Sequence, residues 1–568
     1  MYARAWLILF FYLWTCAGYS QLFFENKAVD LGIINSGGSY NGVDPGGLSF
    51  FDYDNDGWDD ITIGGKSSSQ PIRFYKNNSG TFVEEFFNIT LTGFVKQVIW
   101  VDYDGDGDND FFAAVWDGSV KLFNNDGNFV FTDVTISAGF PNSSLKSHGA
   151  SFGDYDNDGF LDVFISTLDY FMILPNYLYH NNGDGTFTNV SISAGIGIGS
   201  HYSFASAFLD FNNDGYQDIY VINDRVNTTN LLYRNNGNGT FTDISAASNS
   251  NVQIDAMSTG IEDFDYDGNL DIYITNTPSG NVFLKNSGNE TFTNIATITG
   301  TVLNSTSWGA NFADFDNDTD LDLYVSTSDP NVNGFFRNIA PNSYETPTNI
   351  GIDADVLHSY SNVIGDINND GYVDILANND VPENSSLWRN AGGTNNWLKV
   401  KLQGVQSNTH GVGSWIEVSV NGSIMNRYLL CGESFIGQNS AMEFFGLGTA
   451  STIDYIKVKW LSGVEDVLYN VNPNQTLTII ENSNPLTNEE FDLQKIKIFP
   501  NPSSGFINIH GVRENLSVTI YDSFGRLIDS KYININSSKI DLNSYSKGIY
   551  FLEFKSAQNS ITKKIILN

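Results

Sequence analysis

The stretch DYDNDGFLDVFI, from Asp154 to Ile165, is one of seven similar segments in this chain. In each segment, acidic or amide side chains alternate with spacer residues, and a turn, one further Asp and an apolar run follow. The segments begin at Asp52, Asp102, Asp154, Asp210, Asp263, Asp314 and Asp366, which lie 50 to 56 residues apart. A period of this length is typical of repeat proteins in which each repeat forms one small structural unit.

The side chains at positions 1, 3, 5 and 9 of each segment can converge on one hard cation. Calcium takes about six to eight oxygen ligands, and a glycine at position 6 permits the sharp turn that such a loop needs. Position 7 offers a backbone carbonyl, which is that of Phe160 in the third loop. The sixth loop has Thr319 where the other loops have glycine, which predicts weaker binding or a distorted turn there.

We therefore expect up to seven structural calcium ions, one in each loop. The predicted ligands are Asp52, Asp54, Asp56 and Asp60; Asp102, Asp104, Asp106 and Asp110; Asp154, Asp156, Asp158 and Asp162; Asp210, Asn212, Asp214 and Asp218; Asp263, Asp265, Asp267 and Asp271; Asp314, Asp316, Asp318 and Asp322; and Asp366, Asn368, Asp370 and Asp374.

The alternative is a solvated acidic turn, because Asp and Asn favour turns in any case. Seven such loops in register would place several carboxylates close together seven times, and that repulsion needs a counter-ion. Magnesium fits less well because it keeps more of its water. Protein oxygens are expected to fill each cage, which favours a structural role over a catalytic one.

The composition points to an exported β protein. The chain has 28 basic and 65 acidic residues, a formal charge of −37, which argues against a nucleic-acid partner or an anionic membrane surface. Aromatic residues make up 14%, and Gly and Asn are frequent, which favours strands and turns. Cys16 and Cys431 are the two cysteines, so no disulfide framework remains if a leader is removed. Bound metal could then stabilise the fold instead.

Residues 1–20 are predicted to be a secretory signal peptide, with Arg4, an apolar core from Leu7 to Trp14 and a small-x-small pattern before Gln21. The apolar run is too short to span a bilayer. The alternatives are a buried N-terminal strand and a lipoprotein anchored at Cys16, whose neighbours fit a lipobox poorly. No other segment approaches transmembrane length.

Four short strands per repeat predict an all-β fold, a seven-bladed β-propeller over residues 21–394 followed by two small β-sandwich-like domains. After the seventh loop the fourth strand is missing. Residues 22–33 resemble a lone fourth strand, so we expect them to complete the last blade and close the ring. The repeat is absent from residues 395–482, whose alternating pattern predicts a separate β domain. Residues 483–494 are predicted to be a linker, and residues 495–568 are predicted to form a third β unit.

The loops, each preceded by an apolar strand such as Ala150–Gly153, resemble the FG-GAP/VCBS repeats of integrin-α-type propellers. Residues 397–481 resemble the ASPIC/UnbV domain of the cartilage acidic protein family, through motifs that include Phe445–Gly448 and Trp460–Gly463. The last 75 or so residues, with Phe499–Pro502 and Lys547–Tyr550, resemble the type A C-terminal sorting domain of type IX secretion. The resemblance implies export to the cell surface through that machinery, and it says little about function.

No catalytic motif stands out, and we do not expect an enzyme. His148, His201 and His358 each begin a strand that precedes a loop, and the resemblance makes that strand the innermost one, so they could line the funnel opposite the calcium loops. Their unequal offsets from the loops favour ordinary strand-end histidines over a metal cluster. Cys431 is expected to be buried and unreactive.

Trp58, Trp116 and Trp388 could stack on sugars, although packing between blades is the better expectation. The leading hypothesis is a secreted, calcium-stabilised module for binding or adhesion at the cell surface, with a glycan or protein ligand on the face opposite the calcium loops. The alternative is an extracellular carbohydrate-active enzyme on the same scaffold, because abundant Asp could supply an acid pair.

Overall fold

The computed structural model describes residues 22–34, 46–65, 71–171, 174–196, 199, 202–328, 332–340, 343–380, 382–484, 496–510, 516–533, 539–555 and 560–568. The predictions for the signal peptide, for most of the linker and for His201 lie outside these residues. The chain divides into two compact units, residues 1–485 and 486–568, and each is treated by itself.

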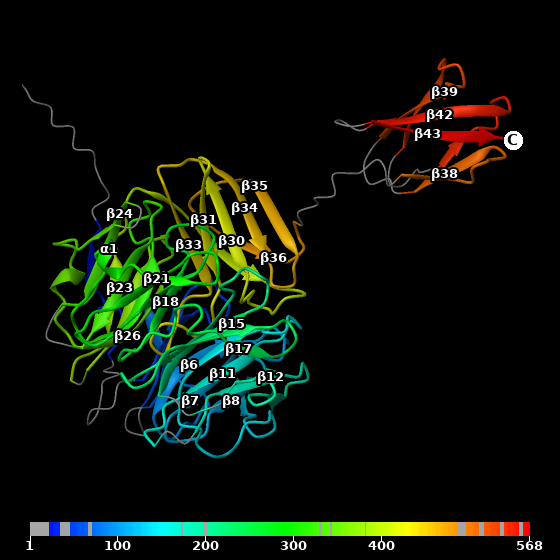
Figure 1. The fold of residues 1–568 in the computed structure, drawn as a ribbon. Coiled ribbons are helices and arrows are strands. Elements are labelled where there is room, and N and C mark those ends of the chain that lie inside the picture. Colours follow the sequence, from blue (N-terminus) through cyan, green and yellow to red (C-terminus); the bar gives the residue numbers. More distant parts are fainter. Residues whose placement is uncertain are drawn as a thin grey trace, which may run out of the picture. The chain divides into compact units, whose positions relative to one another are not determined.

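Seven sheets occupy the repeat region of the first unit within the described residues (Figure 1). Their strands are β2 (Leu48–Phe51), β3 (Asp60–Ile63), β4 (Arg73–Asn77) and β5 (Phe82–Glu85), with β32 (Gly437–Gln438) added parallel to β2; β6 (Val95–Val101), β7 (Asp110–Val115), β8 (Lys121–Asn125) and β9 (Phe131–Asp133); β10 (Ser147–Gly153), β11 (Asp162–Thr167), β12 (Tyr177–Asn181) and β13 (Phe187–Asn189); β14 (Ser203–Leu209), β15 (Asp218–Asn223), β16 (Leu231–Asn235) and β17 (Phe241–Asp243); β18 (Thr259–Glu262), β19 (Asp271–Ile274), β20 (Val282–Asn286) and β21 (Phe292–Asn294); β22 (Ser307–Ala313), β23 (Asp322–Thr327), β24 (Gly334–Ala340) and β25 (Ser343–Glu345); and β26 (Ser359–Gly365), β27 (Asp374–Asn379), β28 (Ser386–Asn390) and β1 (Phe24–Asn26).

Each acidic loop joins the first strand of a sheet to the second. In the third sheet, β10 runs into Asp154 and β11 begins at Asp162, with Gly153 paired to Asp162 across the two strands. All seven loops therefore lie at one end of their sheets. The turns between second and third strands lie at the other end, because neighbouring strands are antiparallel.

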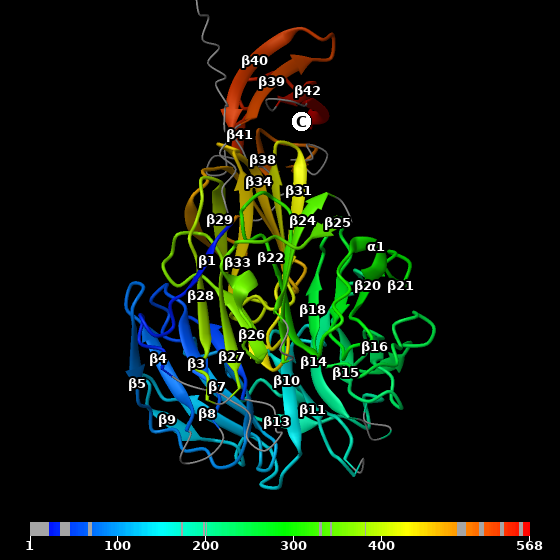
Figure 2. The same ribbon diagram turned by 90° about the vertical axis from the view of Figure 1, so that its left-hand side faces the viewer.

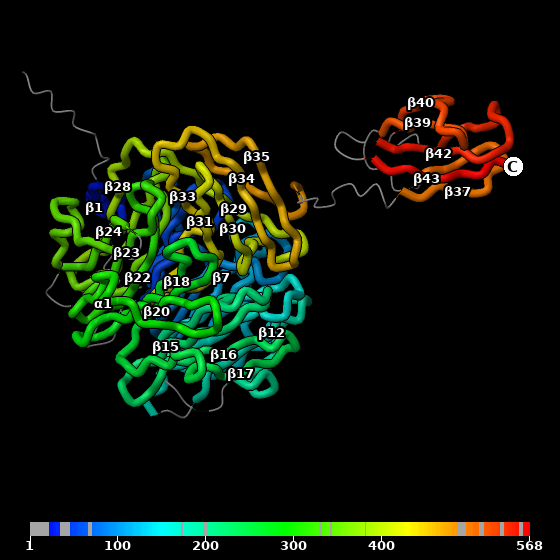
Figure 3. The backbone as a smooth tube through the Cα atoms, turned by 45° about the horizontal axis from the view of Figure 1, so that its top comes forward, coloured from blue at the N-terminus to red at the C-terminus, as the bar shows by residue number. Residues whose placement is uncertain are grey.

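The sheets are arranged around a common centre, as the two further views show (Figures 2 and 3). First strands of successive sheets lie side by side, and β26 of the last sheet also lies against β2 of the first. β1 pairs with β28, so the N-terminal segment supplies the outer strand of the last sheet. The first strands are buried along almost their whole length, which suits their near-continuous runs of apolar and small residues.

Residues 396–480 form two further sheets around a core of their own, within the same unit as the repeats. One holds β29 (Asn396–Gln403) between β33 (Met442–Gly448) and β36 (Gln475–Ile480), and the other runs β31 (Ser423–Tyr428), β30 (Trp415–Val420), β34 (Ile453–Lys459) and β35 (Glu465–Val471). We call residues 396–484 the cap domain.

The second unit is a pair of sheets with its own apolar core. The smaller sheet comprises β37 (Lys497–Phe499), β38 (Phe506–His510) and β41 (Lys539–Asp541). The larger comprises β40 (Leu527–Ile533), β39 (Leu516–Asp522), β42 (Gly548–Lys555) and β43 (Ser560–Leu567). The only helices in the described chain are the short α1 (Ala296–Thr299) and the single 3₁₀ turn η1 (Ile352–Ala354), so the all-β prediction is confirmed.

Candidate metal centres and the surfaces around them

The third loop shows how backbone hydrogen bonds shape each acidic loop. The Asp154 carboxylate at position 1 accepts the N–H groups of Asp158 at 3.0 Å and Gly159 at 2.9 Å. The Asp162 carboxylate at position 9 accepts the N–H groups of Tyr155 at 3.1 Å and Asn181 at 2.8 Å. Positions 1 and 9 are therefore fixed by the backbone, and Asp156 at position 3 joins them in one cluster.

Left-handed backbone explains the residue choice at positions 4 and 6. Position 4 is Asn in five loops, with φ of 60° at Asn157, a conformation that Asn tolerates well. Gly159 at position 6 has φ of 93°, which glycine adopts without steric cost. Thr319 takes the same position in the sixth loop at φ of 91°, so the turn is kept, and a β-branched side chain is strained there.

The oxygens of the ligands predicted at positions 1, 3 and 9 converge in four of the loops. At positions 1, 3 and 9 of the first, second, third and fifth loops, one carboxylate oxygen from each residue lies within 4.8 Å of the others. Oxygens on opposite sides of a calcium ion, each about 2.4 Å from it, are separated by about this distance. These acidic clusters can therefore hold a metal ion.

Several buried oxygens at ligand positions have no hydrogen-bond partner, which is the second reason that the loops fit a cation. They are Asp265 Oδ1, Asp271 Oδ2, Asp316 Oδ1 and Asn368 Oδ1. A buried acceptor left unpaired costs about 1–3 kcal/mol, and more when it is charged. Metal coordination would satisfy these oxygens, and calcium matches their all-oxygen character.

Burial also shifts the acidity of the ligands. It raises the pKa of Asp60, Asp110 and Asp271, all at position 9, to about 9. Burial and the adjacent Asp162 carboxylate raise the pKa of Asp154 to about 8. These carboxylates are costly to ionise together, and a bound cation would favour the ionised form.

On the third strand of most sheets, a basic residue reaches the loop carboxylates. These basic residues were not predicted from the sequence. Lys76 contacts Asp54 and lies 3.0 Å from Asp56, and Lys285 makes the same pair of contacts in the fifth loop. In the sequence, this position is the residue that precedes an Asn at the end of the third strand. In chain order the residues at this position are Lys76, Asn124, His180, Arg234, Lys285, Arg337 and Arg389. Asn124 is neutral, and Arg234 and Arg389 pair with Glu290 and Glu25 instead of a loop carboxylate.

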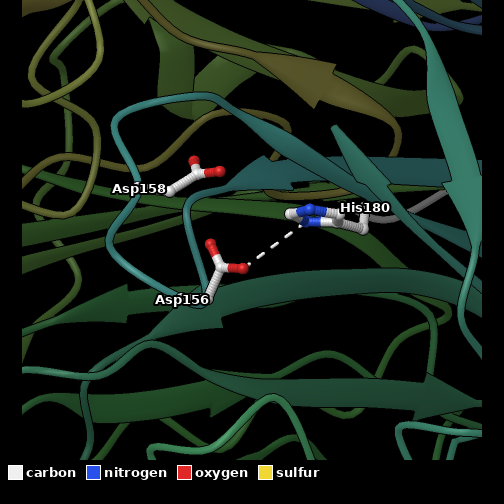
Figure 4. A group of neighbouring side chains, drawn as sticks. All are labelled: Asp156, Asp158 and His180. Atoms are coloured by element: carbon white, nitrogen blue, oxygen red, sulfur yellow. Dashed lines mark ion pairs between the residues drawn. The ribbon is translucent and has the colours of Figure 1, made fainter. Parts of the chain in front are cut away.

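In the third loop this position is His180 (Figure 4). Its Nδ1 lies 3.1 Å from Asp162 Oδ1 and 3.5 Å from Asp156 Oδ2. The hydrogen bond to Asp162 and the surrounding carboxylates raise the pKa of His180 to about 9. Asp156, Asp158 and His180 form a further group whose ligand atoms lie within 4.8 Å of one another.

Asn side chains connect several of the loops to a neighbouring loop. The position-4 amides of Asn157, Asn213, Asn317 and Asn369 donate to the position-6 carbonyl of the next loop, at 2.8 to 3.0 Å. The last of these bonds, from Asn369 to Gly57, joins the seventh loop to the first. These bonds link the third, fourth and fifth loops to one another and the sixth, seventh and first loops to one another, so disturbing one of these loops should affect its neighbours.

The cap domain lies on this acidic face. Lys401 Nζ is 3.1 Å from Asp52 Oδ2 in the first loop, and Lys399 Nζ is 2.9 Å from Asp366 Oδ2 in the seventh. Both lysines come from β29, where residues two apart share a face. The Asn426 side chain donates to Asp263 Oδ2 at 2.8 Å in the fifth loop. The cap domain therefore supplies counter-charges and hydrogen bonds directly to predicted metal ligands.

The centre of the ring is filled by residues 429–441 of the cap domain, which we call the plug. Innermost strands of a ring of sheets leave backbone groups unpaired on their inner edges. The Gln438 side chain accepts from Trp100 N–H at 2.9 Å and donates to the Trp100 carbonyl at 2.8 Å. The Ile364 N–H donates to Asn439 Oδ1 at 3.0 Å, and the Phe152 N–H to the Cys431 carbonyl at 2.8 Å. The plug thus pairs free strand edges from several sheets.

The plug also has an apolar tip. Phe435 is fully buried, and its ring centroid lies 4.9 Å from that of Trp308 and 5.8 Å from that of His148. His148 is itself buried and stacks on Phe204, whereas His358 is exposed. The two described histidines of the predicted funnel set therefore lie in different surroundings, and His148 serves packing.

The face opposite the acidic loops carries a row of aromatic side chains, Phe94, Trp116, Tyr170 and Tyr202, which we call the aromatic row. Neighbouring ring centroids are 6.5, 5.7 and 6.1 Å apart along the row. Tyr170 is 53% exposed and the adjoining Phe171 is 83% exposed. Each member lies in a turn or at a strand end remote from the loops, on the second, third and fourth sheets.

The remaining predicted residues are single cases. Trp388 is buried and packs between sheets, Trp58 is half-buried in the first acidic loop, and Trp116 belongs to the aromatic row. Cys431 is buried in the plug, and burial raises the pKa of its thiol far above its usual range.

Three families match successive parts of this chain. Residues 52–113, 102–165, 168–221, 210–274 and 263–325 match the FG-GAP-like repeat, 404–485 match ASPIC and UnbV, and 497–568 match the secretion system C-terminal sorting domain. The protein combines FG-GAP-like repeats, an ASPIC and UnbV domain and a type IX sorting tail. The predicted resemblances are confirmed, and the tail indicates secretion to the cell surface or extracellular space. The seventh loop, from Asp366, lies outside the matched repeats.

Two curated relatives match part of this FG-GAP-repeat protein. Cartilage acidic protein 1 from Homo sapiens is 31% identical over 147 residues, 25% of this chain and 21% of that protein. The same protein from Xenopus tropicalis is 28% identical over 151 residues, 26% of this chain and 22% of the relative. The chain thus spans about a fifth of the length of these relatives.

Solved structures are similar only at a coarse level. The extracellular domain of a putative one component system from B. thetaiotaomicron has a TM-score of 0.37 and 10% identity, covering 97% of this chain and 60% of that one. Saccharomyces cerevisiae Sqt1 has a TM-score of 0.37 and 11% identity, covering 65% and 98%. Among the described residues, no helix has the length and apolar character needed to cross a membrane.

Proposed function

We propose that this protein is a secreted, seven-bladed β-propeller, stabilised by calcium in its acidic loops, that binds a glycan or protein ligand at the cell surface. It is not an enzyme in this proposal. The ligand binds on the face that carries the aromatic row, opposite the loops.

One observation supports this choice of face above the others. The cap domain contacts the acidic loops, and the plug pairs strand edges in the centre of the ring. A ligand would have to displace packed protein from both places. The opposite face instead presents Tyr170 and Phe171 to solvent.

The chemistry of the aromatic row suits a glycan or a protein hot spot. Aromatic rings stack on the apolar faces of sugars and also dominate protein interfaces. Lys146 Nζ lies 4.8 Å from the centroid of Trp116, and the Arg225 guanidinium 5.6 Å from that of Tyr202. These cations could add hydrogen bonds or contacts with acidic groups beside the row.

The test uses the mature chain on a glycan array and on whole cells, with the double variant Tyr170→Ala and Phe171→Ala. Both side chains are exposed, so the variant should fold normally and lose at least about tenfold in binding if the row carries the ligand. Ile192→Ala is the matched control, because Ile192 is 89% exposed in the turn that follows β13. Equal binding by both variants would refute the assignment. Release of sugar products by the wild-type protein would favour the carbohydrate-active enzyme instead.

A further inference from the structure

We propose that the seven acidic loops are unequal cation sites and that the second loop, from Asp102 to Asp110, is the tightest. This inference rests on the calcium binding proposed above. The calcium affinities differ because basic side chains compete with calcium for the carboxylates of some loops and not of others.

The second loop is distinguished by what surrounds it. It has four carboxylates at ligand positions, and none of them forms an ion pair with a basic side chain of the described chain. Its third-strand residue is Asn124, which accepts a hydrogen bond from the Tyr103 hydroxyl at 3.0 Å. No built-in positive charge therefore opposes a cation there.

The first loop is the natural comparison, because it has the same four Asp positions and the same glycine. Lys76 contacts Asp54 and Asp56 from the third strand, and Lys401 contacts Asp52 from the cap domain. Two ammonium groups thus reach ligand carboxylates. Each repels an incoming cation and must be released from a carboxylate before all the ligands can bind it.

The third, fourth, fifth and sixth loops fall between these two. His180 contacts the third loop, Lys285 the fifth, and Arg337 lies 4.0 Å from Asp316 in the sixth. The fourth loop has no ion pair to its carboxylates, because Arg234 pairs with Glu290 instead, but one of its ligands is the neutral Asn212. The seventh loop combines a neutral Asn368 with Lys399 and should bind weakly.

Ligand charge and the surrounding field set calcium affinity over several orders of magnitude. Moving one positive charge to or from a distance of about 5 Å changes the affinity for a divalent ion by about tenfold or more. We therefore expect a calcium titration in distinct classes, with the second loop filling first and the first and seventh loops last.

A reciprocal exchange of the third-strand residues tests this. The mature chain is titrated with calcium at low ionic strength, and bound ions are counted by native mass spectrometry alongside calorimetry. Asn124→Lys should weaken the tightest class by about tenfold, and Lys76→Asn should strengthen one weak site by about tenfold. Asp104→Asn, which keeps the shape of the side chain, should remove the tightest class.

Circular dichroism checks that each variant is folded, and terbium luminescence gives a second readout of the same sites. If the wild-type protein fills all loops with one affinity, or if the two exchange variants titrate like wild type, the inequality is wrong although calcium binding stands. If no calcium binds at all, both the inequality and the proposed calcium stabilisation are refuted.

Discussion

Lys399→Met is the most informative single substitution for the contact between the cap domain and the acidic loops. The side chains of Lys399 and Asp366 are 1% and 0% exposed, and Nζ lies 2.9 Å from Oδ2. Removing the lysine leaves a buried carboxylate without its partner, which costs about 3–5 kcal/mol. Lys457→Met removes a comparable pair, 2.9 Å from Glu417, but these side chains are 22% and 15% exposed, so the cost should stay below about 1 kcal/mol.

Urea unfolding followed by tryptophan fluorescence measures this difference. Eight tryptophans lie between Trp58 and Trp460 and none lies in residues 486–568, so the signal reports on the first unit. The protein should be held in chelator, because calcium in the seventh loop would replace part of the lost charge. Adding Asp366→Asn to Lys399→Met should recover stability, since it removes the unpaired charge. Equal midpoints for Lys399→Met and Lys457→Met would refute the buried pair.

Three further outcomes follow from the loops and the plug. Gly371→Ala should destabilise the first unit more than Gly215→Ala. A Cβ at Gly371 would lie 1.9 Å from the Trp397 ring, whereas a Cβ at Gly215 would meet nothing within 4 Å. Equal urea midpoints for the two variants would contradict the contact between Gly371 and Trp397. Calcium binding should release protons at pH 7 and strengthen as the pH rises. Burial raises the pKa of Asp110 to about 9, and the ion binds the deprotonated carboxylate. Identical calorimetric heats in buffers of different ionisation enthalpy would argue against this proton release. Cys431 should resist thiol reagents until the protein unfolds, because it is buried and its thiol pKa is raised, and rapid labelling of native protein would mean that the plug opens.

The repeating part of the structure could be predicted because the local geometry of each loop determines which residue types it needs. Position 1 must accept two backbone N–H groups, position 6 needs a left-handed turn, and position 9 begins the next strand. The same residue types therefore recur at these positions in each loop. The sequence also held the signal of the third-strand basic residue. It was missed because lysine and arginine on an exposed strand are ordinary, and only the fold shows that they reach the loop.

The cap domain could not be placed in the same way. Lys399 and Lys401 read as the polar face of an alternating strand, a pattern that normally faces water. Nothing local shows that this face meets carboxylates from loops 33 and 349 residues earlier in the chain. The plug is similar, because Gln438 and Asn439 look like loop residues until the unpaired inner strand edges supply partners. Long-range pairing of polar groups leaves no periodic trace in a sequence.

Calcium content together with thermal melting tests the central claim most directly. The mature protein should carry bound calcium, and a calcium chelator should lower its Tm strongly, with recovery on adding calcium but not magnesium. An ion that binds only the native state adds about 2.7 kcal/mol per site when it is present at about 100 times its Kd. A protein that contains no calcium and melts at the same temperature with and without chelator would contradict the assignment of the acidic loops as the metal centres that hold the ring together.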